Sequence, residues 1–173
     1  MLVIAAARGS RIPGKRGGKR RNAGFTLIEV MVVVALLAIV SAIGAPSFRS
    51  FIGTMNSKSA AFDLINDLTV ARSEAIKRNR NTSMVPVGGD WAKGWQVQDA
   101  GGAVLRERPA LTSALSVSGA AVAGVQFRPN GRLSADTDFG NQNWSISSTI
   151  SGVTARCVII SPTGSARSKP GVC

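Results

Sequence analysis

Residues 25–45, FTLIEVMVVVALLAIVSAIGA, decide the fold of this 173-residue chain. At about 1.5 Å per residue, a helix over this stretch is about 32 Å long, which spans a bilayer core of roughly 30 Å. A buried core helix is the competing interpretation, but a small domain rarely surrounds a helix that is apolar on every face. A cleaved secretory signal ending at Ala45 is a second rival, although the run is longer than a signal core. We therefore expect a transmembrane helix over 25–45.

The segment ahead of this helix is strongly basic. Residues 1–24 contain no acid, and their cations are Arg8, Arg11, Lys15, Arg16, Lys19, Arg20 and Arg21. Segments rich in Lys and Arg stay in the cytoplasm. We therefore expect a single-pass protein with a cytoplasmic N-terminus, whose chain is exported from residue 46 onward.

The composition excludes most catalytic classes. The chain has 21 Lys and Arg, 9 Asp and Glu, no His and 2 Cys. Without His, the commonest general base, metal ligand and partner of a nucleophile are missing. Two cysteines cannot close a structural zinc site, and neither a P-loop nor a nucleophile elbow is present. We expect no enzyme activity, no metal and no cofactor.

Glu29 is an acid near the start of the apolar run. A carboxylate inside a membrane costs roughly 2.5–3.5 kcal/mol on insertion scales, which makes a functional role the first hypothesis. One alternative is that Glu29 lies close enough to the interface for water to reach it. The other is that a cation neutralises it, either a leader arginine or an α-amino group created by cleavage ahead of Phe25.

The segment Gly24–Val30, GFTLIEV, resembles the processing site of type IV pilins and type II secretion pseudopilins, and the similarity extends to Pro46. In that family a prepilin peptidase cuts after the glycine, and the new N-terminal residue is N-methylated. The resemblance implies cleavage between Gly24 and Phe25 and N-methylation of Phe25. It also implies that Glu29 pairs with the Phe25 amine of a neighbouring subunit during filament assembly, since opposite charges attract strongly in a low dielectric.

The exported part is predicted to begin as a continuation of the helix. From Ser47 to about Asn79, apolar residues recur mostly three or four apart, and Glu74 can pair with Arg78. These apolar residues are Phe48, Ile52, Met55, Phe62, Ile65, Leu68, Ala71 and Ala75. Pro46 should kink this helix without ending it.

Beyond Arg80 the pattern changes to short strand signals separated by turns. The predicted strands are Thr82–Val87, Gly94–Gln98, Val104–Arg108, Leu115–Ser118, Val125–Arg128, Trp144–Ser148 and Arg156–Ile160. Turns are expected at 100–102 and 129–131. Trp95, Phe127 and Trp144 are interpreted as core residues, because no basic residues are regularly interleaved with them.

Three further segments resemble the GspH/FimT branch of minor pilins: ARSEAIKRN (71–79), VQFRPNGR (125–132) and RCVIISPTGSAR (156–167). The resemblance implies an α+β, pilin-like fold, in which a long N-terminal helix, transmembrane in its first half, packs on a C-terminal antiparallel β-sandwich-like domain. The expected divisions are a removed leader (1–24), a transmembrane and filament-core helix (25–45), the periplasmic amphipathic half of that helix (46–80) and a β-rich domain (81–173).

The same resemblance implies where the protein works and with what. The expected place is the bacterial inner membrane, with a periplasmic C-terminal domain, and then a pilus or pseudopilus filament. The expected partners are a prepilin peptidase, other major and minor pilins or pseudopilins, and the inner-membrane assembly platform.

Cys157 and Cys173 suit an exported protein, because thiols outside the cytoplasm commonly oxidise. A pair of free buried thiols is the alternative. A disulfide would close a C-terminal loop, and loops of this size are stabilised by about 3 kcal/mol in chain-entropy models.

Within that loop, the polar segment 161–170 carries two cations and no acid, and could hold phosphates. DNA-uptake minor pilins of the FimT type have a Gly-Arg-x-Arg motif in this region, and here only Gly164 and Arg167 match it. Lys169 and Arg156 are candidates to replace the missing arginine, and a merely solvated loop is the alternative interpretation.

Two functions follow. The first is a minor pilin or pseudopilin of a type IV pilus or type II secretion system that assembles in the filament tip or priming complex and binds double-stranded DNA without sequence preference. The alternative is a GspH-type minor pseudopilin that acts only in type II protein secretion and binds no DNA.

Overall fold

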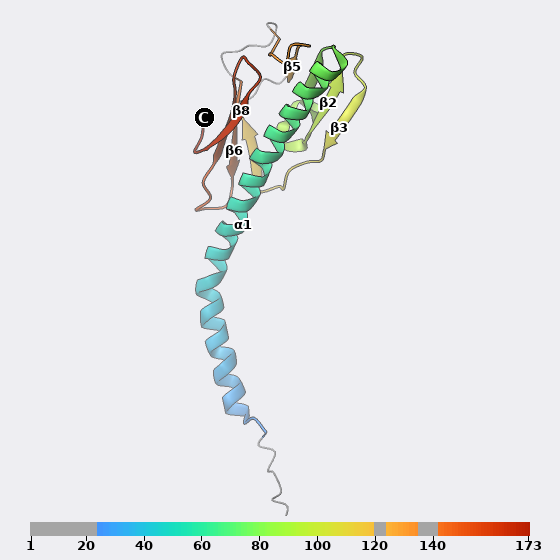
Figure 1. Ribbon diagram of the computed structural model, residues 1–173. Helices are drawn as coiled ribbons and strands as arrows, with labels where there is room; N and C mark the ends of the chain where they lie inside the picture. Colours follow the sequence, from blue (N-terminus) through green and yellow to red (C-terminus); the bar gives the residue numbers. More distant parts are fainter. Residues whose placement is uncertain (1–23, 120–123, 135–141) are drawn as a thin grey trace, which may run out of the picture. The chain divides into compact units, whose positions relative to one another are not determined.

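A computed structural model of the chain describes residues 24–119, 124–134 and 142–173 (Figure 1). The predicted leader lies outside the described residues, apart from Gly24. Helix α1 (Leu27–Arg78) is followed by two short 3-10 turns, η1 (Val87–Gly89) and η2 (Trp91–Lys93). The strands are β1 (Thr82–Pro86), β2 (Trp95–Asp99), β3 (Val104–Arg108), β4 (Leu115–Ser118), β5 (Val125–Phe127), β6 (Asn143–Ser148), β7 (Arg156–Ile160) and β8 (Ala166–Pro170).

The chain divides into two compact units, Met1–Ile39 and Val40–Cys173. In the first unit, the described residues form the beginning of α1, and their large apolar side chains from Leu27 to Ile39 are 50–79% exposed. By length and composition alone, α1 is apolar enough to cross a membrane. Large apolar side chains that no other described residue covers mark a surface suited to lipid or to other subunits.

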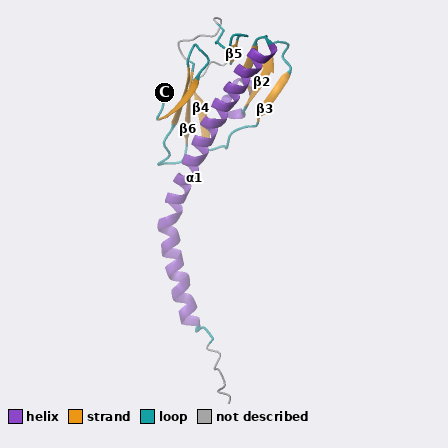
Figure 2. Ribbon diagram, viewed as in Figure 1, coloured by secondary structure: helices purple, strands orange, loops and turns teal. Residues whose placement is uncertain are grey.

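The second unit contains two four-stranded antiparallel sheets, coloured orange in Figure 2. The first sheet has the strand order β3-β2-β1-β5, and the second has the order β4-β6-β7-β8. Side chains from both sheets and from the second half of α1 form one buried cluster. The expected α+β architecture, a long N-terminal helix followed by antiparallel sheets, is thus confirmed.

Aromatic side chains fill the centre of this core. Trp95, Phe127 and Trp144 are at most 2% exposed, as predicted. Trp91 joins them, with its ring centroid 5.3 Å from that of Trp144 in an edge-to-face arrangement. Such large side chains dominate the apolar area that a small domain can bury.

The face of α1 that packs on the sheets is not the one that its larger apolar residues suggest. Buried positions include the small residues Gly53, Ser57, Ala60 and Ala61, together with Leu64 and Leu68. In contrast, Phe48, Ile52, Met55 and Phe62 are 40–67% exposed. Small residues allow the helix to approach the sheets closely, and the larger apolar side chains consequently face outward.

The seven predicted strands are all present, with ends that differ by no more than one residue. The expectation that 161–170 is a loop is wrong, because Ala166–Pro170 forms strand β8, paired with β7 from Arg156↔Pro170 to Ile160↔Ala166. Strand β8 lies at the edge of its sheet and is polar, so it lacks the apolar alternation by which strands are recognised.

Candidate functional site

The first candidate element is the start of α1, where Thr26 and Glu29 cap the helix reciprocally. The Glu29 N–H lies 3.3 Å from Thr26 Oγ1, and the Thr26 N–H lies 3.5 Å from Glu29 Oε2. This is the geometry of a capping box, which satisfies two backbone N–H groups that would otherwise lack partners. The Thr-x-x-Glu spacing that signals it is present in the sequence, but the two interpretations of Glu29 made from the sequence were access to water at the membrane interface and pairing with a cation. Within one chain, Glu29 therefore has a local role in starting the helix.

The second candidate element is the C-terminal sheet. The predicted disulfide between Cys157 and Cys173 is present. It holds the chain end against the sheet, where the Cys173 N–H donates to Ser145 Oγ at 2.8 Å and the Gly171 N–H donates to the Ala155 carbonyl. Edge strand β8 is thus bonded to β7 along its length and is fastened again beyond its end.

Arg167 and Lys169 lie on β8 and share one face of the sheet, because side chains two residues apart on a strand point the same way. Their register partners on β7 are Ile159 and Cys157, and both cationic residues are exposed. Within the described residues, neither forms an ion pair with an acid.

Arg156 does not join them. Its register partner is Pro170, and the alternation along β7 places it on the same face as Val158 and Ile160, which turn toward the core. The structure therefore brings two of the three predicted cations together and leaves the third on the opposite face of the sheet.

Gly164 is buried in the turn between β7 and β8, where it packs against the turn that contains Gly131. Its φ of +81° lies in the left-handed region, and a Cβ at this position would lie 2.3 Å from the Gly131 carbonyl oxygen. The turn is closed by the Ser161 N–H donating to the Ser165 carbonyl and the Gly164 N–H donating to the Ser161 carbonyl. Glycine is therefore required here both by backbone conformation and by space.

Replacing Gly164 by alanine should lower the free energy of unfolding by about 2 kcal/mol, since positive φ and a close backbone contact both oppose a Cβ. Gly171→Ala is the matched control, because Gly171 has φ +95° with nothing within 4 Å of the added Cβ, and should cost about 1 kcal/mol. Thermal unfolding of the two variants measures the difference. Equal losses would show that the contact with Gly131 is unimportant.

One buried charged group was missed by the sequence interpretation. Asp67 of α1 has its side chain 1% exposed and accepts a hydrogen bond from Trp95 Nε1 at 2.9 Å. Arg108 Nε lies 3.1 Å from Asp67 Oδ2, and Arg106 Nε lies 2.7 Å from Asp67 Oδ1. Asp67 therefore ties the helix to β2 and β3 through charged contacts.

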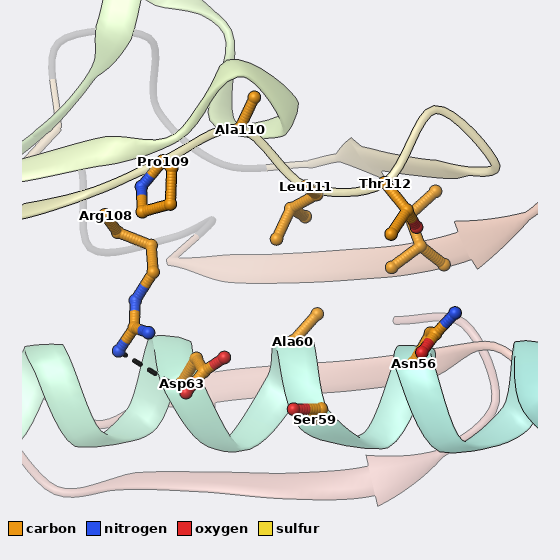
Figure 3. A pocket seen from close by; sticks show the side chains of 10 residues that line it. Asn56, Ser59, Ala60, Asp63, Arg108, Pro109, Ala110, Leu111 and Thr112 are labelled. Atoms are coloured by element: carbon orange, nitrogen blue, oxygen red, sulfur yellow. Dashed lines mark ion pairs between the residues drawn. The ribbon is translucent and has the colours of Figure 1, made fainter.

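A pocket of about 230 Å³ lies beside this network and is shown in Figure 3. Asp63 and Arg108 line it and form an ion pair at 3.4 Å, while Pro109 to Thr112 form the opposite wall. The Asp63 carboxylate and the Arg108 guanidinium therefore carry opposite charges on facing walls of this pocket. No group of three or more His, Cys, Asp or Glu side chains with metal-binding geometry occurs in the part of the chain that the structure describes.

The exposed apolar helix start and the helix-on-sheets domain define a class, that of pilin-like subunits. The chain matches the family model of the type II transport protein GspH over residues 60–164 and the prokaryotic N-terminal methylation motif over residues 19–45. This chain belongs to the GspH family.

Solved structures agree with this assignment. Two crystal structures of the type IV minor pilin FimU of Pseudomonas aeruginosa are similar to this chain, with TM-scores of 0.55 and 0.50 and identities of 27% and 29%. They cover 66% and 65% of this chain, and 88% and 92% of the FimU chains.

Two curated proteins match over shorter stretches. The type IV major pilin protein PilA of Myxococcus xanthus is 38% identical over 60 residues, which is 35% of this chain and 27% of PilA. The prepilin peptidase-dependent protein D of Escherichia coli is 38% identical over 53 residues, which is 31% of this chain and 34% of that protein. The chain thus matches only about a third or less of the length of these curated relatives.

The chain is therefore a minor pilin or pseudopilin of a type IV pilus or type II secretion system, and such proteins are structural rather than enzymatic. Its methylation motif and apolar helix fit a membrane-anchored subunit.

Proposed function

We propose that this subunit joins the tip or priming complex of its filament and carries there a DNA-binding surface on strand β8. Its N-terminus faces the cytoplasm and its sheets face the periplasm before assembly on the inner-membrane platform. The similarity to minor pilin FimU, which spans most of the FimU chain, supports a minor rather than a major subunit.

Maturation is assigned to the start of the chain. Cleavage between Gly24 and Phe25 would create a new α-amino group, which is N-methylated in this family, four residues ahead of Glu29. The Phe25 amine of a neighbouring subunit and the Glu29 carboxylate would then form an ion pair in the apolar filament core. The match to the methylation motif over residues 19–45 supports this assignment.

The outward face of α1 supports assembly as well. Phe48, Phe51, Ile52, Met55 and Phe62 are 40–67% exposed on the second unit's part of the helix. Contiguous exposed apolar surface marks an interaction site. Other pilin-like subunits, which present apolar helices of the same type, would cover it in the filament.

The DNA-binding role depends on one observation, the exposed pair Arg167 and Lys169 on a single face of an edge strand. From Arg108 to the last residue, the chain contains only two acids, Asp136 and Asp138, and neither belongs to the described C-terminal sheet. Cations without acidic partners on a firmly held strand can contact phosphates, and such contacts do not depend on base sequence.

The double variant Arg167→Ala/Lys169→Ala should weaken retention of duplex DNA about tenfold, because two phosphate contacts are lost. Incorporation into filaments should remain normal. The matched control is Arg49→Ala/Lys93→Ala, which removes the same charge from exposed positions on other elements. Binding of duplex DNA by the full-length chain in detergent is the measurement, and unchanged retention and DNA uptake in the first variant would exclude the receptor role.

A second candidate function is favoured by the family match itself, whose description is a type II transport protein. In that case the chain acts only in protein secretion and binds no DNA. Secretion that depends on this chain, together with an absence of DNA binding by the unmodified protein, would establish it.

A further inference from the structure

We propose that Arg128 and Arg132, on the turn after β5, form a second phosphate-binding pair that extends the DNA-binding surface of β8. This inference rests on the proposed function, because it assigns further contacts to the same ligand. The two arginines lie outside the C-terminal segment from which the first candidates came.

The turn holds the two arginines close together. The Arg128 N–H donates to the Arg132 carbonyl at 2.8 Å, and Asn130 Oδ1 accepts from the Arg132 N–H at 3.1 Å. Phe127 and Leu133 are paired at the base of the turn and are at most 4% exposed. Both arginines are exposed. Two guanidinium groups therefore extend into solvent from a rigid base, which reduces the entropy lost when they bind an anion.

The same turn packs on the turn that leads into β8. The Leu133 N–H donates to the Pro162 carbonyl at 3.2 Å, and the Gly131 carbonyl oxygen lies against Gly164. Arg72 of α1 fastens this junction, since its Nε donates to the Gly131 carbonyl at 3.0 Å. The elements that carry Arg128 and Arg132 are thus locked to the turn that precedes Arg167.

Arg128, Arg132 and Arg167 differ from the paired arginines beside α1 and β3. Beside α1 and β3, Arg78 pairs with Glu74, and both Arg106 and Arg108 pair with Asp67. In contrast, Arg128, Arg132 and Arg167 have no acidic partner among the residues that the structure describes. Neighbouring cations repel one another, and a polyanion such as duplex DNA relieves that repulsion.

The test uses the full-length chain in detergent and short duplexes of two unrelated sequences, with binding measured over a range of salt concentrations. Arg128→Ala/Arg132→Ala should weaken binding about fivefold for both sequences and reduce the slope of log K against log salt by about 2. The lysine variant Arg128→Lys/Arg132→Lys should keep most of the binding. The control Arg49→Ala/Lys93→Ala should change it less than twofold.

The outcomes distinguish this inference from the proposed function. If Arg167→Ala/Lys169→Ala weakens binding and Arg128→Ala/Arg132→Ala does not, the second pair is refuted and the β8 surface stands. Equal losses in the second pair and in the control would also refute it, because net charge alone would then explain the effect. No binding by the unmodified chain overturns both. A chain that binds phosphatidylglycerol vesicles through these arginines, but binds no duplex DNA, would have a lipid surface as its ligand. That result would overturn both this inference and the proposed DNA-binding function.

Discussion

Glu29→Val should reduce incorporation of this subunit into filaments by about thirtyfold, while its level in the membrane stays the same or rises. Valine removes the insertion cost of roughly 2.5–3.5 kcal/mol that an intramembrane carboxylate carries. The variant therefore enters the lipid more easily, but it offers no partner to the Phe25 amine of its neighbour. Losing about 2 kcal/mol of pairing free energy in a low dielectric corresponds to that factor.

The capping box makes a sharper control possible, because Glu29 also caps its own helix through Thr26. Glu29→Gln keeps the capping geometry, since glutamine serves equally at this position, and removes only the charge. We expect Glu29→Gln to be incorporated as poorly as Glu29→Val. Normal incorporation of the glutamine variant would show that helix capping, not pairing with an amine, is the role of Glu29. Mass spectrometry of each variant should find Phe25 as the N-methylated first residue, which ensures that assembly rather than processing is compared.

Local patterns were sufficient to predict most of the fold. The apolar run marked the start of α1, and short β-branched segments marked the strands from Thr82 to Ile160. The pair Glu74 and Arg78 was predicted from its spacing and is present at 2.6 Å. Its hydrogen bond holds the pKa of Glu74 below the ordinary value, so the pair stabilises the helix end at neutral pH and is lost as acidification passes the lowered pKa.

The features that the sequence did not predict share one cause: which side chains are buried depends on partners that are distant in the sequence. Strand β8 is polar because its outer face meets solvent, and only its pairing with β7 makes it a strand. The buried face of α1 has small residues because two sheets approach it there. Likewise, the proposed pair Arg128 and Arg132 was not singled out from the sequence, because only the packing of two turns brings it near Gly164.

Asp67 illustrates the same limit and carries the largest expected effect on stability. It lies on the buried stripe of α1, four residues before Ala71 and three after Leu64. An acid at such a position is the sequence signal for a buried ion pair. Its partner Arg108 lies 41 residues further along the chain, and Arg106 lies two residues before Arg108. Both arginines belong to edge strand β3, and the spacing of apolar residues in α1 does not indicate that this strand contacts the helix.

Asp67→Ala should lower the free energy of unfolding by about 3–4 kcal/mol, because it leaves the buried Trp95 N–H without an acceptor, leaves Arg106 without its acid and removes the nearer of the two acids that Arg108 contacts. The corresponding drop in Tm is about 10 °C for a domain of this size. Asp63→Ala is the matched control one helical turn earlier, since the Asp63 side chain is 38% exposed and makes a single contact of 3.4 Å with Arg108. It should cost less than about 1 kcal/mol.

Thermal unfolding followed by tryptophan fluorescence suits this comparison, because Trp95 is itself a member of the network. A loss with Asp67→Ala no larger than with Asp63→Ala would mean that the network is solvated and contributes little. The two arginines are partly exposed, at 41% and 24% of their side chains, so water compensates some of their lost pairing. The indole N–H of Trp95 is buried, so water does not compensate for the loss of its acceptor. We therefore assign most of the expected loss of stability to the hydrogen bond between Trp95 and Asp67.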